Sequence, residues 1–480
     1  MDFVPPTHPP SAVRTSLQVL NATLPRTAAA AATQAAATRV DPRWALRLQG
    51  EDALLVTSAA ILARSWQDDA AEAVELCDAA LERFTPAARL AMPAATLSAF
   101  HAAIAEAHAT AGWPRKAAFH AAIAARESAS VGSDEGSFRA HALLAVSHAL
   151  NAEYADARAA ADTAHALARA HGWGTTRAFY PLLLGEIMLH SSTLDAPGLR
   201  AIVAQLRETL PDDTTWQATA ITAESMALLV ENETSRALAT VMAVTNGTER
   251  PGVLRMIRGF AVGVHADALL ARGEGLRTLG LLSGEPSPAG HSLCFDMQRA
   301  SAHLQLGENR QALHTTDQCV RLGMDHCLRT LSPILFRRAI ANHRLGHQGA
   351  ADRDFEDAVN LVLSSGSATP LLTLPRTDLL VLLERLAQSR PDLKATLRAF
   401  QERLAQVPPV RQGSPLPALT PRERVLAERL RDETTIAAQA SALHVSPNTL
   451  KTQLRSLYRK LGVGSRDAAV LELERHGFYG

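Results

Sequence analysis

The sequence predicts an all-α protein in which a long array of helical hairpins precedes a smaller helical domain. Alanine supplies much of the 47% apolar content and aromatic residues only 4%, and small side chains let helices pack closely. No convincing run of alternating β-branched residues indicates a strand. Turn-like joints recur about every 40 residues, as expected of a stacked helical array, or α-solenoid.

Length and charge limit the classes of function that are open to the chain. A chain of 480 residues is too long for one ordinary core, so we expect two or more domains or an extended array. Its 48 basic and 48 acidic residues balance, so any surface for nucleic acid must be local. Four cysteines, Cys77, Cys294, Cys319 and Cys327, form no disulfide scaffold and fit a reducing cytoplasm.

The N-terminal residues predict neither a signal peptide nor a membrane span. They lack a basic region followed by an apolar run, and the alanine tract between Arg26 and Arg39 is too short and too polar to cross a bilayer. Residues 1–26 carry repeated prolines and few apolar anchors, so we expect a disordered tail there. We expect a cytoplasmic protein with no membrane partner.

Similar joints between helices recur through residues 27–406. Alanines that open the second helix of a hairpin recur at regular distances: Ala117 and Ala157 are 40 residues apart, and Ala312 and Ala351 are 39 apart. The Leu-x-x-Gly-x-x-x-x-Ala joints resemble tetratricopeptide repeats, in the longer and more divergent form of bacterial regulators. An irregular helical bundle is the alternative. The joints lie near residues 66–70, 111–117, 151–157, 194–196, 231–237, 272–275, 306–312 and 345–351.

A proline-rich segment, residues 407–418, follows the array. Its four prolines prevent a continuous helix and predict a semi-extended linker. Beyond it, residues 419–480 show four short helical patterns and carry ten basic and seven acidic residues, a net charge of +3. The first helix begins with a capping box at Thr420 and Glu423, and Ser465 caps the fourth.

The third of these helices, residues 446–462, has two different faces. Ser446 is its N-cap and Gly462 ends it. One face carries leucines at helical spacing, while basic residues recur every four positions beside it and no acidic residue occurs. These faces suit insertion into the major groove of DNA; a solvated face on an ordinary packed helix is the alternative. The leucines are Leu450, Leu454, Leu457 and Leu461, and the basic residues are Lys451, Arg455 and Arg459.

Three blocks of the C-terminal sequence, residues 419–423, 445–452 and 455–463, closely resemble the LuxR-type (GerE-like) DNA-binding domain of bacterial transcription regulators. The resemblance implies a helix-turn-helix domain whose third helix reads the major groove. It also implies that the fourth helix, Arg466 to His476, forms a dimer contact.

The same resemblance assigns roles to residues of the third helix. Lys451, Thr452 and Arg455 match positions that face bases and nearby phosphates. The residues expected against the phosphate backbone are Ser446, Asn448, Thr449, Arg459 and Lys460.

The second helix departs from the family pattern. Gln439 stands where the family has a buried isoleucine, Ala438 replaces a glutamate, and Gln453 in the third helix takes a position often held by histidine. A glutamine in the core is costly unless its amide finds partners. Alternatively, the helix begins at Thr434 or Thr435 with Ile436 as its apolar contact.

Histidines and cysteines invite a metal hypothesis. The closest group is His314, Cys319, His326 and Cys327, but Cys319 and Cys327 are eight residues apart with Gly323 between them. That step suits one helix face poorly, so we expect core cysteines, exposed histidines and no metal or other cofactor.

No other site chemistry is indicated. His101, His108 and His120 have roughly helical spacing, and we expect them on the surface or in a groove. No P-loop and no nucleophile–base pair occurs in the sequence, so we expect no enzyme and no catalytic residue.

Two functional hypotheses follow. The first is a sequence-specific transcription regulator, an activator by resemblance, that binds double-stranded DNA as a homodimer and contacts RNA polymerase. Its solenoid would receive an unidentified peptide, protein or small molecule. The second is a solenoid scaffold or adaptor whose C-terminal domain dimerises without reading DNA.

Overall fold

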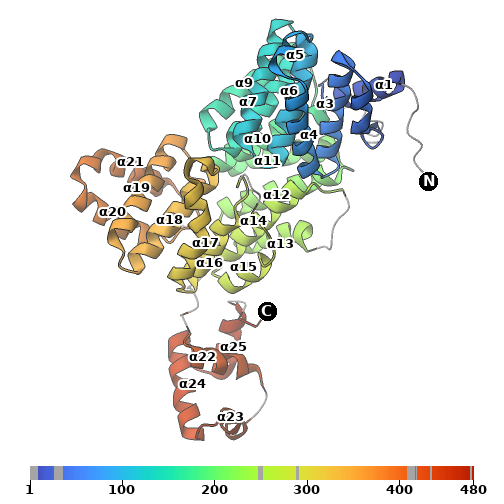
Figure 1. Cartoon of the computed structure of the whole chain (residues 1–480). Coiled ribbons are helices and arrows are strands. Elements are labelled where there is room, and N and C mark those ends of the chain that lie inside the picture. The colour runs from blue at the N-terminus through green and yellow to red at the C-terminus, as the bar shows by residue number, and fades with distance from the viewer. Residues whose placement is uncertain are drawn as a thin grey trace.

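The fold is all-α, as the sequence predicts (Figure 1). The computed structural model describes residues 9–25, 36–246, 252–287, 291–407, 417, 419–432, 435–475 and 478–479. Throughout these ranges the regular elements are α-helices and short 3₁₀ helices, with no strand. No helix among these residues is both long and apolar enough to cross a bilayer.

The N-terminal segment is more ordered than the sequence predicts. Residues 1–26 are expected to be disordered, but Pro9–Asn21 form helix α1, which packs against α3 (Gly50–Trp66). Ser16 and Val19 are fully buried. The prediction of disorder is wrong for α1 because its two prolines occupy the first turn, where a missing N–H costs nothing.

Helical hairpins then follow one another to α21. The helices are α3, α4 (Ala70–Arg83), α5 (Pro86–Leu90), α6 (Ala94–Thr110), α7 (Pro114–Ser130), α8 (Asp134–Leu150), α9 (Tyr154–His171), α10 (Tyr180–Ser192), α11 (Ala196–Thr209), α12 (Thr214–Val230), α13 (Thr234–Thr245), α14 (Arg255–Ala271), α15 (Gly275–Leu281), α16 (Phe295–Gln305), α17 (Asn309–Leu322), α18 (Leu328–Arg344), α19 (Gln348–Ser365), α20 (Arg376–Ser389) and α21 (Lys394–Gln406). Short 3₁₀ helices at Pro42–Arg47 (η1), Arg177–Phe179 (η2), Gly323–Asp325 (η3), Thr369–Leu371 (η4) and Pro391–Leu393 (η5) connect some of them.

The first helices of successive hairpins form the inner layer of the array. α6 packs against α8, α8 against α10, and α12 against α14, in addition to the contacts within each hairpin. α6 is buried nearly all round, whereas its partner α7 buries mainly alanines on one side. A helix that is apolar all round belongs inside, and an amphipathic one covers it. The stacked arrangement predicted for the array is therefore present.

Each predicted joint has the same backbone turn. One residue of every joint has a positive φ, and the N–H of the next residue bonds back to the carbonyl five positions earlier, as Glu153 N does to His148 O at 2.9 Å. This is a Schellman-type helix end. The alanine that opens the following helix is buried, for example Ala157 and Ala237. The positive-φ residues are Asp68, Gly112, Ala152, Leu194, Asn232, Gly273, Gly307 and Gly346.

The array curls until distant hairpins touch. Cys327 Sγ donates to Leu150 O at 2.8 Å, although 177 residues separate them. Ala368 N donates to Ser192 O at 2.7 Å across a similar distance in sequence, and Arg255 N donates to Asp68 Oδ1 at 2.6 Å. The solenoid is therefore a tight superhelix in which one turn rests on the next.

The C-terminal helices form a separate core below α15 and α16 in Figure 1. They are α22 (Pro421–Glu428), the 3₁₀ helix η6 (Arg429–Arg431), α23 (Ile436–Ala442), α24 (Pro447–Leu461) and α25 (Arg466–Arg475). Leu276 of α15 packs against this core. The predicted linker falls largely on residues 408–416 and 418, which lie outside the described residues.

Candidate nucleic-acid interface

Helix α24 begins and ends where its sequence predicts. Ser446 Oγ accepts a hydrogen bond from Thr449 N at 3.0 Å, and Pro447 occupies the first helical position. Gly462 ends the helix with φ of 70°, a left-handed conformation that favours glycine. Val463 N then bonds back to Tyr458 O at 2.9 Å. Both ends are thus fixed by local chemistry.

The leucine face of α24 supplies the core of the C-terminal domain. Leu450 and Leu457 are fully buried, against partners that include Leu426 of α22 and Leu473 of α25. Burying one such side chain contributes about 1.5–3 kcal/mol. Because this face is held by three other helices, the opposite face of α24 is directed away from the domain.

The opposite face is cationic and exposed. Lys451, Arg455 and Arg459 are all exposed, and none forms an ion pair with any residue in the described ranges. Thr452 Oγ1 donates to Asn448 O at 3.0 Å within the helix. These charges are available to a polyanion, and the same exposure also fits the alternative of an ordinary solvated face.

The first turn of α24 presents the smaller polar side chains. Ser446, Asn448 and Thr449 are exposed, and Ser446 Oγ and Thr449 Oγ1 are 2.8 Å apart. The positive end of the helix dipole at this turn favours an anion. Three of the predicted phosphate-binding residues therefore lie at the end of the helix that suits a phosphate, whereas Arg459 and Lys460 lie in its last turn.

Lys460 differs from the other predicted site residues. Its Nζ lies 2.6 Å from Glu423 Oε2, and the two side chains are 32% and 16% exposed. Glu423 also completes the predicted capping box, accepting from Thr420 N at 2.8 Å. Burial raises the pKa of Glu423, but the Lys460 ammonium and the Thr420 N–H outweigh burial, so the pKa lies below its usual range. The ion pair of Lys460 with Glu423 thus connects α24 to α22.

Gln439 is accommodated in the core of the domain. It is buried, and its Nε2 donates to Arg429 O at 3.2 Å and to Asp432 O at 3.4 Å, where η6 ends. α23 begins after the cap Thr435. The alternative contact by Ile436 is wrong, because this side chain is 38% exposed. The amide therefore replaces an apolar contact by fixing the connection between α22 and α23.

The turn between α23 and α24 needs a left-handed residue. His444 takes this position with φ of 53°, and Val445 N bonds back to Ala440 O at 3.0 Å. This turn sets the angle between the two helices of the helix-turn-helix pair.

Residues near the C-terminus stabilise the domain through contacts that the sequence did not predict. Tyr479 Oη donates to Ala427 O at 2.7 Å, and the Arg431 guanidinium lies 4.2 Å from the Tyr479 ring centre. Arg466 Nε donates to Leu430 O at 2.8 Å. Two adjacent aromatic residues, Phe478 and Tyr479, in a chain with few aromatics were the available signal.

Three histidines of the solenoid are buried between α6 and α7. His101, His108 and His120 are expected on the surface but are buried, with His101 Nδ1 and His120 Nδ1 2.9 Å apart. Burial lowers the pKa of His101 and of His108 to about 4, and that of His120 to about 3. The expectation is wrong because small alanines around these rings let α6 and α7 close over them.

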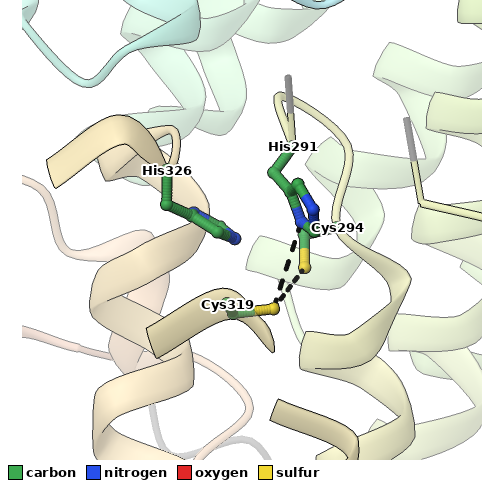
Figure 2. A group of neighbouring side chains, drawn as sticks. All are labelled: His291, Cys294, Cys319 and His326. Carbon is green, nitrogen blue, oxygen red and sulfur yellow. Dashed lines mark hydrogen bonds between the residues drawn. The ribbon is translucent and has the colours of Figure 1, made fainter. Parts of the chain in front are cut away.

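Only two members of the histidine–cysteine group considered from the sequence, Cys319 and His326, lie in a cluster of potential metal ligands. His314 is exposed, and Cys327 Sγ is bound to Leu150 O. Cys319 and His326 instead lie beside His291 and Cys294 (Figure 2). All four cysteines are buried, as expected of core cysteines.

A cavity of about 180 Å³ lies within the curl of the solenoid. Its apolar wall includes Leu184, Met188 and Phe260. Three charged residues, Asp267, Arg329 and Arg337, also line it. Burial raises the pKa of Asp267 to about 6 and lowers that of Arg337 to about 10.

Some polar atoms of the cavity lining have no partner. Gln298 Oε1 and Ser332 Oγ are buried and accept or donate no hydrogen bond within the part of the chain that the structure describes. Both residues are 4% exposed. An unpaired buried polar atom costs about 1–3 kcal/mol, so these atoms are suited to a bound molecule.

Comparison with known proteins covers the C-terminal domain. Residues 417–473 match the family described as bacterial regulatory proteins, luxR family. Probable transcriptional regulatory protein NarL from two Mycobacterium tuberculosis strains, CDC 1551 / Oshkosh and ATCC 25618 / H37Rv, is 46% identical over 59 residues, 12% of this chain and 27% of NarL. Spore germination protein GerE of Bacillus subtilis (strain 168) is 41% identical over 61 residues, 13% of this chain and 82% of GerE. The chain thus spans most of GerE but only a minor part of NarL.

Proposed function

The chain belongs to the luxR family of bacterial regulatory proteins, and we propose that it is a sequence-specific, DNA-binding transcription regulator. The observation that carries the proposal is α24, a helix whose leucine face is buried and whose basic face is exposed and unpaired among the described residues. A rigid helix of this kind fits the major groove of DNA.

In this proposal α24 makes two kinds of contact with DNA, one with the phosphate backbone and one with the bases. The first turn of α24, with Ser446, Asn448 and Thr449, binds the phosphate backbone and fixes the register, together with Arg459. Lys451, Thr452 and Arg455 reach the base edges, where a bidentate arginine–guanine pair discriminates by about 1–3 kcal/mol. Lys460 supports these contacts indirectly through its ion pair with Glu423.

A double substitution tests the proposal. Lys451→Ala with Arg455→Ala removes two exposed cations of α24 and no buried group, so specific binding should be lost while thermal unfolding is unchanged. The matched control is Lys394→Ala with Arg398→Ala, which removes two cations from α21 of the solenoid. Promoter footprints that survive in the first variant contradict the assignment of the reading helix.

Dimeric binding is part of the same proposal. Two copies joined through α25 would place their α24 helices about 34–36 Å apart, one turn of DNA. Analytical ultracentrifugation of the protein with a two-half-site duplex and with a single half-site checks the stoichiometry. One copy on each duplex would contradict dimerisation without contradicting DNA binding.

A scaffold that dimerises without reading DNA is the alternative. Its main support in the sequence was Gln439, and that support is weaker because the amide has two carbonyl partners. Salt titration separates the two functions. Affinity that falls steeply with salt indicates phosphate contacts, with a logarithmic slope of about 0.9 per contact, whereas an apolar dimer is nearly insensitive to salt.

The solenoid supplies the signal in this proposal, and the cavity is its receiving site. We propose as occupant a small organic molecule with an apolar body and a hydrogen-bond donor. A dry cavity of about 150 Å³ accommodates benzene, so the volume here suits a molecule of that order. The donor would pair with Gln298 Oε1, which has no other partner among the described residues.

Model compounds test the receiving site. Indole and benzyl alcohol, which carry a donor, should raise the melting temperature more than p-xylene, which carries none. Gln298→Leu should remove the difference between them. Met226 also lines the cavity, so Met226→Trp should fill the cavity and remove all shifts. The control Leu90→Trp changes a residue that is 88% exposed. If the compounds raise the melting temperature of the Met226→Trp variant as much as that of the wild-type protein, the cavity is not their binding site.

A further inference from the structure

Four buried side chains from separate segments converge beside the cavity. His291 and Cys294 come from the connection before α16, Cys319 from α17, and His326 from the connection that follows η3 (Figure 2). Their potential ligand atoms all lie within 4.8 Å of one another. Each side chain is at most 5% exposed.

The spacing of these atoms fits a tetrahedral metal. Cys294 Sγ and Cys319 Sγ are 3.6 Å apart, and Cys319 Sγ is 4.0 Å from His291 Nδ1. In tetrahedral zinc sites the Zn–S distance is about 2.3 Å and the Zn–N distance about 2.0–2.1 Å, which separates neighbouring ligands by roughly 3.4–3.8 Å. The group is therefore close to a Cys₂His₂ geometry and needs adjustments of only a few tenths of an ångström at these two pairs.

His326 is oriented as a metal-binding histidine. Its Nδ1 donates to the carbonyl oxygen of Cys327 at 2.9 Å, which leaves Nε2 as the unprotonated nitrogen. Nε2 is buried, has no hydrogen-bond partner in the described part of the chain, and points toward the other three side chains (Figure 2). Metal-binding histidines generally use one nitrogen for the metal and donate from the other to a carbonyl or carboxylate.

The surroundings hold the group in place. Thr330 Oγ1 donates to His291 O at 2.7 Å, and Arg329 donates to Ser292 O. Asp296 Oδ2 is 3.8 Å from Cys319 Sγ, but this carboxylate pairs with Arg299 at 2.7 Å. Asp296 is therefore held by Arg299 and is not a competing ligand, and its weak hydrogen bond from the Cys319 thiol is lost when that thiol gives up its proton.

A disulfide explains less of this arrangement. Its sulfurs are about 2.05 Å apart, so Cys294 and Cys319 would have to approach each other by more than an ångström from their 3.6 Å separation. A disulfide would also leave His326 Nε2 buried without a partner. A metal ion, in contrast, satisfies all four side chains at once.

We propose that His291, Cys294, Cys319 and His326 bind one zinc ion that fastens the α15–α16 connection to the end of α17. A tetrahedral S₂N₂ donor set favours zinc among common metals. Both cysteines bind as thiolates, and their protons pass to solvent. Cys327, next to His326, bonds to Leu150 O, so the ion also braces the contact between successive turns of the superhelix. This inference is independent of DNA binding.

Metal analysis of the full-length protein tests the proposal. Protein purified without chelator should contain one zinc per chain, and replacement by Co²⁺ should give the intense visible absorption of a tetrahedral site with thiolate ligands. Removal of zinc with a chelator should lower the melting temperature, and added zinc should restore it. Protein that carries no zinc and gives no such cobalt spectrum overturns the proposal.

Variants with a matched control identify the ligands. Cys319→Ser and His326→Ala should each weaken zinc affinity by more than about tenfold, because losing even an outer hydrogen-bond partner of a ligand costs about 10–100-fold. Cys327→Ser alters an equally buried cysteine one residue from His326 and should keep full zinc content. If a ligand variant does not fold, cobalt titration of the wild-type apoprotein still decides. A Cys294–Cys319 disulfide in protein prepared under reducing conditions would overturn the site.

Discussion

The solenoid and helix α24 of the C-terminal domain use their arginines in opposite ways. In the solenoid, guanidinium groups pair with carboxylates of a neighbouring hairpin: Arg344 with Asp378 and Arg385 with Asp352, both at 2.9 Å. In α24, Arg455 has no such partner among the described residues. Paired charges join repeats, whereas an exposed unpaired row on a rigid helix is available for a partner.

Net charge follows the same division. Residues 419–480 carry a net charge of +3, and the remaining residues 1–418 carry 38 basic and 41 acidic residues, a net charge of −3. The neutral whole chain therefore hides two regions of opposite sign. The difference suggests that a polyanion is attracted to one region and repelled by the other.

The largest expected effect comes from the core of the C-terminal domain. Leu457→Ala removes a fully buried side chain from α24 and should cost about 2–5 kcal/mol, enough to unfold so small a domain. In calorimetry, the C-terminal transition should disappear while that of the solenoid remains. The exposed Ile436→Ala should cost under about 0.5 kcal/mol, and a common loss of both transitions would contradict separate cores.

Charge reversal should separate the two uses of arginine. Arg455→Glu should weaken specific DNA binding at least about 100-fold without changing thermal stability, because it replaces a base contact with repulsion. Arg344→Glu should leave DNA affinity unchanged and cost about 1 kcal/mol of solenoid stability. Fluorescence anisotropy and thermal melts measure both. If Arg344→Glu weakened DNA binding and Arg455→Glu destabilised the protein, the roles assigned to the two arginines would be wrong.

Acid should affect the solenoid more than the C-terminal domain. The buried His101, His108 and His120 have folded-state pKa values of about 4, 4 and 3, below 6.5 in the unfolded chain. Since the unfolded chain binds more protons below pH 6.5, their contribution is complete above that pH and declines as pH falls toward 4. At pH 5.5 the loss should be about 1 kcal/mol for each histidine.

Chemical denaturation from pH 7.5 to 4.5 measures this decline. The charged groups that also act on the pKa values of these three histidines are Arg89, Lys116, Arg126, Asp78 and Glu127. His120→Asn should flatten the pH profile of the solenoid transition. A profile that is unchanged in this variant would assign the acid sensitivity to other groups.

The smallest expected effect concerns a turn that both regions share. Ala152 at a solenoid joint and His444 in the helix-turn-helix have φ of 61° and 53°, where side chains other than glycine cost about 1–2 kcal/mol. Ala152→Gly and His444→Gly should each stabilise their own region by up to about 1 kcal/mol. Gly112→Ala, at φ of 85°, should destabilise by a similar amount. Melting temperatures check all three variants.

The sequence by itself determined the local features of this protein. The ends of α24, the capping box at Thr420 and the joints of the hairpins depend on residues no more than about five positions apart, so their signals are legible in the chain. The family resemblance covers the C-terminal residues for the same reason: its motifs are short and contiguous. Lys460 marks the limit, because its partner Glu423 lies 37 residues away.

Only the tertiary structure decided the features that depend on how the array curls. Leu150 meets Cys327, and His291 and Cys294 join Cys319 and His326, because many small rotations between stacked hairpins add up. The sequence of one joint does not reveal the total rotation that accumulates along the array. The sequence therefore predicted the helices and the basic face of α24 that we propose reads DNA, whereas the cavity and the proposed zinc site arise from long-range packing.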